Sequence, residues 1–204
     1  MSATNTDNDA AGVTVTPTAG LVTSESGATA TFSVRLNSQP VASVTIAVLS
    51  SNLLEGLATP AALIFNGANW NTPQTVTVTG VDDLFVDGAA NYTVVTSAAV
   101  STDSNYSGLN PSDVIVTNSD NDTAGITVTP TSGLVTTESG GTATFSQVLT
   151  SQPTANVTIG LSSSNTAEGS VSPVSVTFTA ANWNTPQAVT ISGVNDSIVD
   201  GSVA

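Results

Sequence analysis

Apolar and polar side chains alternate with a period of two along most of the chain. Residues 29–36 read Thr-Ala-Thr-Phe-Ser-Val-Arg-Leu, and residues 44–48 and 75–79 alternate in the same way. Such alternation places apolar side chains on one face of a β-strand and polar side chains on the other. Thr, Val and Ile dominate these segments, and Pro, Gly or Asn interrupts them about every eight to twelve residues. The pattern predicts an all-β fold, an antiparallel β-sandwich in which each sheet has one solvated face.

The first part of the chain carries seven predicted strands. Their expected ranges are 12–17 (continuing to about 23), 28–37, 42–50, 61–66, 74–81, 91–100 and 112–119. The first five recur 113 residues later, and the sequence stops where the sixth would begin again. Within the second copy, Gln147 replaces Val34 at an inward position. We expect either that the Gln147 side chain reaches a backbone partner or that this position is less buried than the pattern suggests.

The recurrence is an internal repeat of 113 residues that runs without a gap. Glu25 recurs as Glu138, and roughly 50 of the 85 alignable positions (7–91 against 120–204) are identical. A unit of this length is a whole domain, because the repeats of solenoid proteins run about 20–45 residues. We therefore expect a tail of a preceding repeat at 1–9, a first sandwich repeat at 10–122, and a second repeat at 123–204 that lacks its last two strands.

The charge composition excludes several classes of function. The chain has 15 acidic residues against one Arg, no Lys and no His, which gives a formal net charge of −14. Such a surface repels nucleic acid and anionic lipid, so we expect no nucleic-acid partner. Without His, Lys or Cys no common nucleophile system can be assembled, so we expect no enzyme. No apolar run approaches the roughly 18 residues that a membrane span needs, so we expect no membrane insertion.

One motif occurs in both copies. In the first copy it is Phe65, four residues, then Trp70-Asn-Thr-Pro-Gln-Thr-Val-Thr-Val and Gly-Val-Asp-Asp; in the second it runs from Phe178 to Asp196. Together with Glu-Ser-Gly at 25–27 and Ser-Asp-Asn-Asp at 119–122, this motif resembles the Calx-β repeat. The resemblance covers the whole first copy and what is present of the second. It implies two tandem immunoglobulin-like sandwiches, as in sodium/calcium exchangers, integrins and large bacterial surface proteins, some of which bind calcium in the loops at one end.

The acidic residues gather at one end of the predicted sandwich. Because sequential antiparallel strands alternate in direction, the loops after the first, third and fifth strands share one pole with the end of the seventh. Seven acidic residues of the first repeat lie at this pole: Glu25, Glu55, Asp82, Asp83, Asp87, Asp120 and Asp122. Like charges this close repel one another, and a bound cation removes that cost. Ca²⁺ takes 6–8 oxygen ligands, whereas zinc and copper prefer the His and Cys that the chain lacks. The arrangement predicts a calcium site.

The second repeat offers a weaker set of ligands. Its members are Glu138, Glu168, Asn195, Asp196 and Asp200. Asn195 stands where the first repeat has Asp82, and it keeps an oxygen ligand without the charge. Asp120 and Asp122 immediately precede the first strand of the second repeat, so the calcium would lie at the joint between repeats. The alternative is that the acidic residues are solvated loop charges, chosen with Asn for turn formation.

These expectations favour a structural role outside the cell. We expect a calcium-stiffened spacer or adhesin repeat of a large secreted or cell-surface protein, whose partners are the neighbouring repeats of the same chain. Scarce Lys and Arg would also deny trypsin-like proteases their cleavage sites. The alternative is a subunit of an extracellular filament. Because the second repeat lacks two strands, its exposed strand edges could be completed by strands from a neighbouring identical chain.

Overall fold

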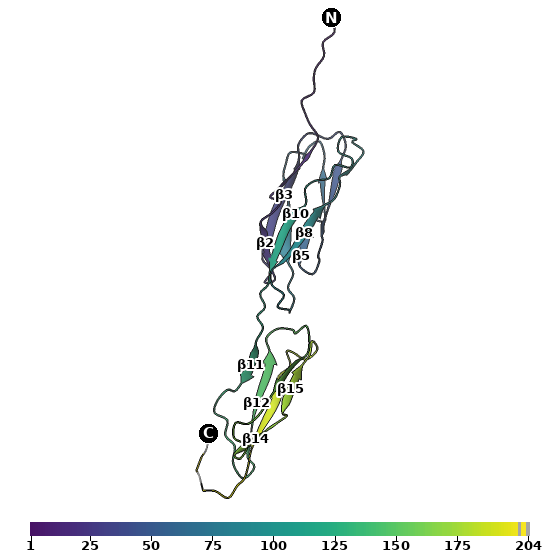
Figure 1. Cartoon of the computed structure of the whole chain (residues 1–204). Helices are drawn as coiled ribbons and strands as arrows, with labels where there is room; N and C mark the ends of the chain where they lie inside the picture. The colour runs from purple at the N-terminus through teal and green to yellow at the C-terminus, as the bar shows by residue number, and fades with distance from the viewer. Residues whose placement is uncertain (200, 203–204) are drawn as a thin grey trace. The chain divides into compact units, whose positions relative to one another are not determined.

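The computed structural model describes residues 1–199 and 201–202, and its regular elements are all β-strands (Figure 1). By contacts the chain divides into two compact units. Unit 1 comprises Met1–Asp83 and Asp87–Asn121, and unit 2 comprises Leu84–Val86 and Asp122–Ala204. In the part of the chain that is described, no helix has the length and apolarity needed to cross a membrane. The predicted all-β, largely antiparallel architecture is confirmed.

The first sheet of unit 1 contains four strands in the order β1-β3-β7-β5. Their bounds are β1 (Val13–Thr16), β3 (Thr29–Leu36), β7 (Gln74–Gly80) and β5 (Gly56–Thr59). All neighbouring strands are antiparallel. Phe32 lies opposite Val76 and Ala30 opposite Val78, so the alternating apolar side chains of the two central strands line one face. That face enters the core, because Phe32, Val76 and Val78 are all buried.

The second sheet of unit 1 has the order β2-β10-β8-β4-β6, and the short strand β9 pairs with β4. The bounds are β2 (Leu21–Ser24), β10 (Val114–Ser119), β8 (Ala90–Thr96), β4 (Val44–Ser50), β6 (Ala62–Phe65) and β9 (Val100–Ser101). The pair β10–β2 is parallel and the other pairs are antiparallel. One core cluster joins both sheets, and Trp70 packs against it.

Two stretches of unit 1 change sheet at a proline, and the sequence pattern did not predict this. The predicted continuous strand through residue 23 is wrong, because β1 belongs to the first sheet and β2 to the second. Pro17 and Gly20, the latter with a φ of 78°, separate them. In the same way Pro60 separates β5 from β6, and β5 was missed. Proline has no N–H to continue a strand ladder, so a strand that meets it ends or leaves its partner.

Unit 2 has the same four-stranded sheet and only part of the other. The sheet β11-β12-β16-β14 is joined by the two-stranded sheet β13-β15. The bounds are β11 (Ile126–Thr129), β12 (Thr142–Leu149), β13 (Val157–Gly160), β14 (Gly169–Ser172), β15 (Ser175–Phe178) and β16 (Gln187–Gly193). Residues 134–136, the counterparts of 21–23 in β2, lie outside any strand. In unit 1, β2 pairs with β10, and unit 2 has no counterpart of β10 among its described residues.

Gln147 is buried, with 5% of its surface exposed, and its Oε1 has no hydrogen-bond partner among the residues that the structure describes. Both expectations for this side chain are therefore wrong, since the position is buried and the oxygen finds no backbone donor. The Gln147 side chain lies on the inward face of β12, as Val34 does in β3. The two residues occupy equivalent positions in the strand pairing, and this pairing points both side chains into the core. A buried polar atom without a partner costs about 1–3 kcal/mol.

We expect Gln147→Val to raise the free energy of unfolding of unit 2 by about 1–3 kcal/mol, because it removes this unpaired oxygen from the core. Urea unfolding of the parent chain and the variant measures the change. Val34→Gln is the matched control, and it should destabilise unit 1 by a similar amount. If Gln147→Val lowers stability, the glutamine makes an interaction that this account lacks.

Candidate metal centre

The parallel pairing of β2 with β10 brings two acidic residues to one edge of unit 1. Parallel strands end at the same edge of a sheet, so Glu25, which follows β2, lies beside Asp120, which follows β10. The backbone fixes this arrangement. The Glu25 N–H donates to the Ser119 carbonyl (3.1 Å), and the Asn121 N–H donates to Glu25 Oε2 (3.0 Å). The Glu25 carboxylate is therefore held against the segment that follows β10.

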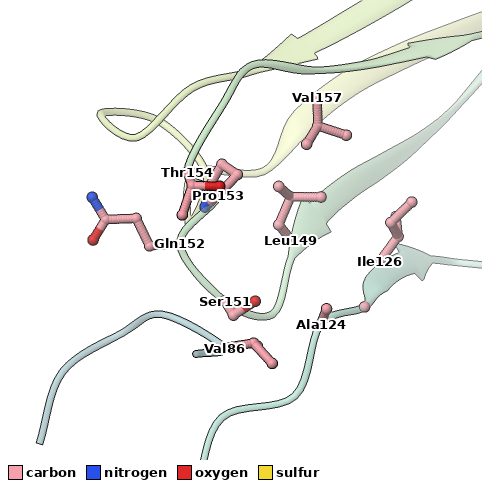
Figure 2. Close-up of a pocket in the computed structure, with 10 residues that line it drawn as sticks. Val86, Ala124, Ile126, Leu149, Ser151, Gln152, Pro153, Thr154 and Val157 are labelled. Atoms are coloured by element: carbon pink, nitrogen blue, oxygen red, sulfur yellow. The ribbon is translucent and has the colours of Figure 1, made fainter. Parts of the chain in front are cut away.

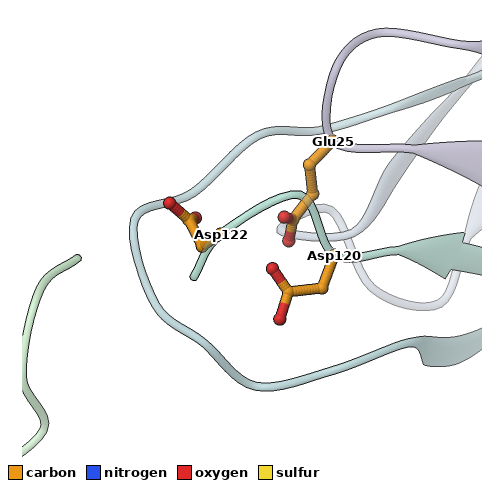
Figure 3. Close-up of side chains that lie close together, drawn as sticks. All are labelled: Glu25, Asp120 and Asp122. Atoms are coloured by element: carbon orange, nitrogen blue, oxygen red, sulfur yellow. The ribbon is translucent and has the colours of Figure 1, made fainter. Parts of the chain in front are cut away.

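Glu25, Asp120 and Asp122 form a cluster of three carboxylates (Figure 3). Each offers one oxygen, and these three oxygens lie within 4.8 Å of one another. Glu25 is buried, with 4% of its surface exposed, and the two aspartates are half-buried. The chain's single basic residue, Arg35, is exposed in β3, ten residues beyond Glu25. The spacing of three oxygens from three carboxylates suits a cation such as Ca²⁺, which binds 6–8 oxygen atoms.

The environment of Glu25 disfavours its charged form. Burial raises the pKa of Glu25 above its ordinary value, and the negative charges of Asp120, Asp83 and Asp87 raise it further. The hydrogen bond from the Asn121 N–H acts in the opposite direction, because it stabilises the carboxylate. A bound divalent cation would stabilise the same carboxylate far more strongly than this hydrogen bond does. It would therefore offset both the burial of the Glu25 charge and its repulsion from the neighbouring aspartates.

A pH dependence follows from the raised pKa of Glu25. At pH values between the pKa of Glu25 in the unfolded state, near 4.5, and its higher pKa in the folded state, the folded state binds more protons than the unfolded state. The contribution of Glu25 to the free energy of unfolding therefore falls as pH rises. In EDTA, Glu25→Gln should therefore stabilise unit 1 relative to the parent by an amount that grows with pH above about 4.5. Thermal melting from pH 4 to pH 7 measures this. Glu138→Gln changes the exposed counterpart in unit 2, so the melting temperature of unit 1 should depend on pH as it does in the parent. If the parent and Glu25→Gln show the same dependence on pH, the expected role of Glu25 is wrong.

The loop between β7 and β8 lies against the same edge. The Gly88 N–H donates to Asp120 Oδ2 (2.8 Å), and the Asn121 side-chain amide donates to Asp82 Oδ1 (3.0 Å). Asp83 and Asp87 contribute their charge to the environment of Glu25. The structure thus brings all three loop aspartates to the predicted pole, although the cluster of converging oxygens consists of Glu25, Asp120 and Asp122.

Glu55 is also at this pole, but its carboxylate is used in a buried polar network. Glu55 has 7% of its surface exposed and accepts a hydrogen bond from the Asn118 side-chain amide (3.3 Å). The same amide nitrogen donates to the Val81 carbonyl (3.1 Å), and the Thr23 hydroxyl donates to Asn118 Oδ1 (3.0 Å). Sequence reasoning missed Asn118. Its signal was an amide at an inward position of β10, in alternation with Val114 and Val116.

Gly80 is a second residue that sequence reasoning missed. A Cβ at this position would collide with the Ser24 carbonyl and with the Asn118 side chain. Only glycine lets the end of β7 approach the end of β2 this closely. The close approach supports the turn that carries Glu25, because Ser24 immediately precedes it.

The predicted ligands of unit 2 are placed differently. Glu138 and Asn195 are exposed, Glu168 and Asp196 are half-buried, and Asp200 lies outside the described residues. An open cavity of about 880 Å³ is lined by Glu138, Glu168 and Asn195, together with residues 134–137, Ser139, Gly201 and Ser202. Among the described residues, Glu138, Glu168, Asn195 and Asp196 do not converge as Glu25, Asp120 and Asp122 do. In unit 1 the counterpart of this cavity is filled, since β10 lies along β2 there.

A second pocket of unit 2, of about 430 Å³, is lined mainly by apolar side chains and by no charged group (Figure 2). One of its lining residues is Ser151, the counterpart of Ser38. In unit 1 the buried Tyr106 reaches Ser38, accepting from its N–H (3.1 Å) and donating to its carbonyl (2.6 Å). The pocket therefore lies where unit 1 places a tyrosine of its own.

Comparison with known proteins gives distant likenesses. No family model and no curated protein matches the chain. Among solved structures, CBD12 from CALX1.2 has 12% sequence identity, a TM-score of 0.42, and coverage of 92% of this chain and 76% of that one. The calcium binding domain CBD12 of CALX1.1 has 14% identity, a TM-score of 0.38, and coverage of 90% and 76%. The E. coli chaperone DraB has 8% identity, a TM-score of 0.37, and coverage of 93% and 89%.

Proposed function

We propose that the chain is a pair of tandem Calx-β-like sandwich repeats in a structural spacer of a secreted or cell-surface protein, and that calcium stiffens the joint between the repeats. The observation that carries this proposal is the convergence of Glu25, Asp120 and Asp122 on oxygens within 4.8 Å. Asp120 and Asp122 belong to the segment that links β10 to β11, so a cation bound there would restrain that segment.

The physical basis is the relief of repulsion at a site that is already assembled. The Glu25 backbone N–H donates to the Ser119 carbonyl, and the Glu25 carboxylate accepts from the Asn121 N–H. Burial raises the pKa of Glu25, and neighbouring carboxylates raise it further. Extracellular modules bind calcium with dissociation constants of about 10⁻⁴–10⁻³ M. At about 1 mM calcium, one such site stabilises the folded state by about 0.4–1.4 kcal/mol. This gain applies to the segment 119–122, which the cation would tie to Glu25.

The proposal predicts that calcium raises the melting temperature of the chain above its value in EDTA. Asp120→Asn plus Asp122→Asn should remove the shift, because the variant loses two of the three converging carboxylates. Differential scanning calorimetry in about 1 mM free calcium and in EDTA measures this shift in melting temperature. Asp7→Asn plus Asp9→Asn makes the same change in net charge in an exposed segment and should keep the shift. A parent chain that melts equally in calcium and EDTA would rule out the site.

The extracellular location and the absence of catalysis are parts of the same proposal. A chain with net charge −14 and a single basic residue offers few sites to trypsin-like proteases and has mutually repelling surfaces, which suit an extended array. The neighbouring repeats are the proposed partners, and neither nucleic acid nor a membrane interior is one.

A second candidate function is supported by unit 2. We infer that unit 2 accepts strands from a neighbouring identical chain, as a filament subunit would. The two cavities of unit 2 coincide with places that residues after β8 fill in unit 1, namely those of Tyr106 and β10. Exposed strand edges readily pair with other chains. Sedimentation of the chain over a range of concentrations tests this candidate, because a concentration-independent monomer would exclude it.

A further inference from the structure

We propose that two copies of the chain pair face to face through the solvent-facing side of the second sheet of unit 1. This is the sheet with the order β2-β10-β8-β4-β6, in which β9 also pairs with β4; β2, β10 and β8 lie side by side in Figure 1. The pairing involves unit 1 alone, and it depends neither on the calcium site nor on strand acceptance by unit 2.

Large apolar side chains occupy the outward face of this sheet. They alternate with the buried core residues of the same strands, and each has between 54% and 72% of its surface exposed. They are Val22, Leu49, Ile64, Val100 and Ile115. A single exposed apolar side chain needs no explanation, whereas several on one face are typical of an interaction site.

Strand pairing brings most of these side chains close to one another. Leu49 of β4 lies opposite Val95 of β8, which is half-buried. Thr45, two turns of the strand pleat before Leu49, has Ile64 of β6 on one side and Val100 of β9 on the other. Side chains directly opposite one another on a sheet face are in contact range. The apolar residues therefore form a connected patch over β4 and its neighbours.

The outward face of the first sheet shows that the strands of unit 1 do not require such residues. Thr77 lies opposite Thr31 on one side and Thr59 on the other. Among the described residues of that sheet, the large apolar side chain that is exposed is Leu57. Hydroxyl side chains are therefore sufficient for a solvated face of this sandwich, and the apolar face of the second sheet needs another explanation.

The second repeat keeps the inward residues of these strands and changes the outward ones. Ser162 stands in place of Leu49, and Thr177 stands in place of Ile64. The inward Phe65, one residue after Ile64, recurs unchanged 113 residues later. β15 forms with Thr177 in it, so an apolar residue at this outward position is not needed for the strand. The apolar patch is a property of the first repeat.

Charge indicates what covers the patch. The six strands of this sheet contain no charged residue, in a chain whose net charge is −14. A charged partner would have to bury its charges there without a counter-charge, which is costly. The partner must therefore present an uncharged apolar surface of its own, and the same face of a second copy is such a surface. Two copies that meet in this way leave their acidic loops in water.

The expected dimer is closed and weak. Five strands of four to seven residues cover roughly 24 Å by 18 Å, so pairing buries on the order of 900 Å² in total. Interfaces below about 1,200 Å² are typical of transient complexes. The two sheets would pack about 10 Å apart with their strands within about 30° of one another. Because each copy uses the same patch, the contact is satisfied at two copies and does not propagate.

Sedimentation velocity of the whole chain tests the pairing. The parent should form dimers with a dissociation constant of about 10⁻⁵–10⁻³ M, since the interface is small. Leu49→Ser plus Ile64→Thr gives the patch the residues of the second repeat, and it should weaken dimerisation at least about tenfold because two apolar side chains are lost from each copy. Raising the salt concentration from about 0.02 M to about 0.5 M should strengthen the parent dimer, because salt screens the repulsion between the acidic chains.

Leu57→Ser is the matched control. It makes the same kind of change on the first sheet, where the second repeat has Ser170, and it should associate as the parent does. A second measurement needs no variant: the methyl NMR signals of Leu49 and Ile64 should shift with protein concentration, whereas those of Leu57 should not. This measurement decides the question if the double variant proves less stable than the parent.

Four results would overturn the inference. They are a parent that stays monomeric above about 1 mM, beyond the expected dissociation constant; association that is unchanged in the double variant; dimers that salt weakens, since opposite charges would then hold the copies together; and methyl signals of the patch that do not respond to concentration. Association that is unchanged in the double variant would leave strand acceptance by unit 2 as its explanation, so the two ideas are separated.

Discussion

Gly80→Ala is expected to destabilise unit 1 by about 2–4 kcal/mol, at or above the usual cost of overpacking a core. The added methyl group would collide with the Ser24 backbone carbonyl and with Oδ1 of the buried Asn118 side chain, which the Thr23 hydroxyl holds in place. Relief would require β7 and β2 to separate, which would break the contacts that hold the Glu25 turn. Urea unfolding of the variant against the parent measures the loss.

Two further glycines control this prediction. Gly160→Ala adds a methyl group with no neighbour within 4 Å, so it should change stability little. Gly193, the counterpart of Gly80, would place its methyl group against the Thr137 carbonyl. Residues 134–136 of unit 2 lie outside any described strand, so the segment before Thr137 can move away from the added methyl group. Gly193→Ala should therefore lower the free energy of unfolding less than Gly80→Ala does. Equal losses at both positions would contradict the claim that β10 holds β2 in place.

Asn118→Leu is expected to destabilise unit 1 by about 2–4 kcal/mol, because it leaves the buried Glu55 carboxylate and the Thr23 hydroxyl without this hydrogen-bond partner. A hydrogen bond to a charged group contributes more than a neutral one, and the unsatisfied charge remains buried. Chemical unfolding checks the change. Asn91→Leu replaces an exposed amide on the neighbouring strand β8 and should have a small effect. A stable Asn118→Leu variant would show that the network is not needed for the fold.

The alternation of side chains predicted the central strands well, because their inward and outward residues differ strongly. β3, β4 and β7 lie within one or two residues of their predicted ranges. The pattern failed at β5, whose four residues, Gly-Leu-Ala-Thr, show no alternation of large and polar side chains. It also failed after β1, where the chain passes from the first sheet to the second. The alternation of apolar and polar residues continues on both sides of the proline, so it gives no sign that β2 pairs in a different sheet from β1.

Strand formation at residues 134–137 could not be judged from local sequence at all. Residues 21–24 read Leu-Val-Thr-Ser and form β2, whereas residues 134–137 read Leu-Val-Thr-Thr and do not form a strand. The difference is the presence of β10, which supplies the hydrogen bonds. Likewise β4 runs for seven residues and β13 for four, because the last part of β4 pairs with β8. A strand is a property of a pair of segments.

The candidate site was predicted in outline and changed in detail. Strand direction was enough to place Glu25, Asp120 and Asp122 at one pole, and the structure brings their oxygens together. Strand direction does not determine loop conformation, and loop conformation decides which groups the other carboxylates at this pole contact. Glu55 faces Asn118, and Asp82 accepts from the Asn121 amide.

The claim that Glu25, Asp120 and Asp122 hold calcium is tested most directly by a calcium titration followed through the NMR signal of the Asn121 amide, which donates to Glu25. We expect a saturable shift with a dissociation constant of about 10⁻⁴–10⁻³ M. Binding should be at least about tenfold weaker in Asp120→Asn plus Asp122→Asn, since two ligand charges are lost. The charge-matched variant Asp7→Asn plus Asp9→Asn should bind as the parent does. An Asn121 signal that does not respond to calcium, or that responds equally in both variants, would contradict the account.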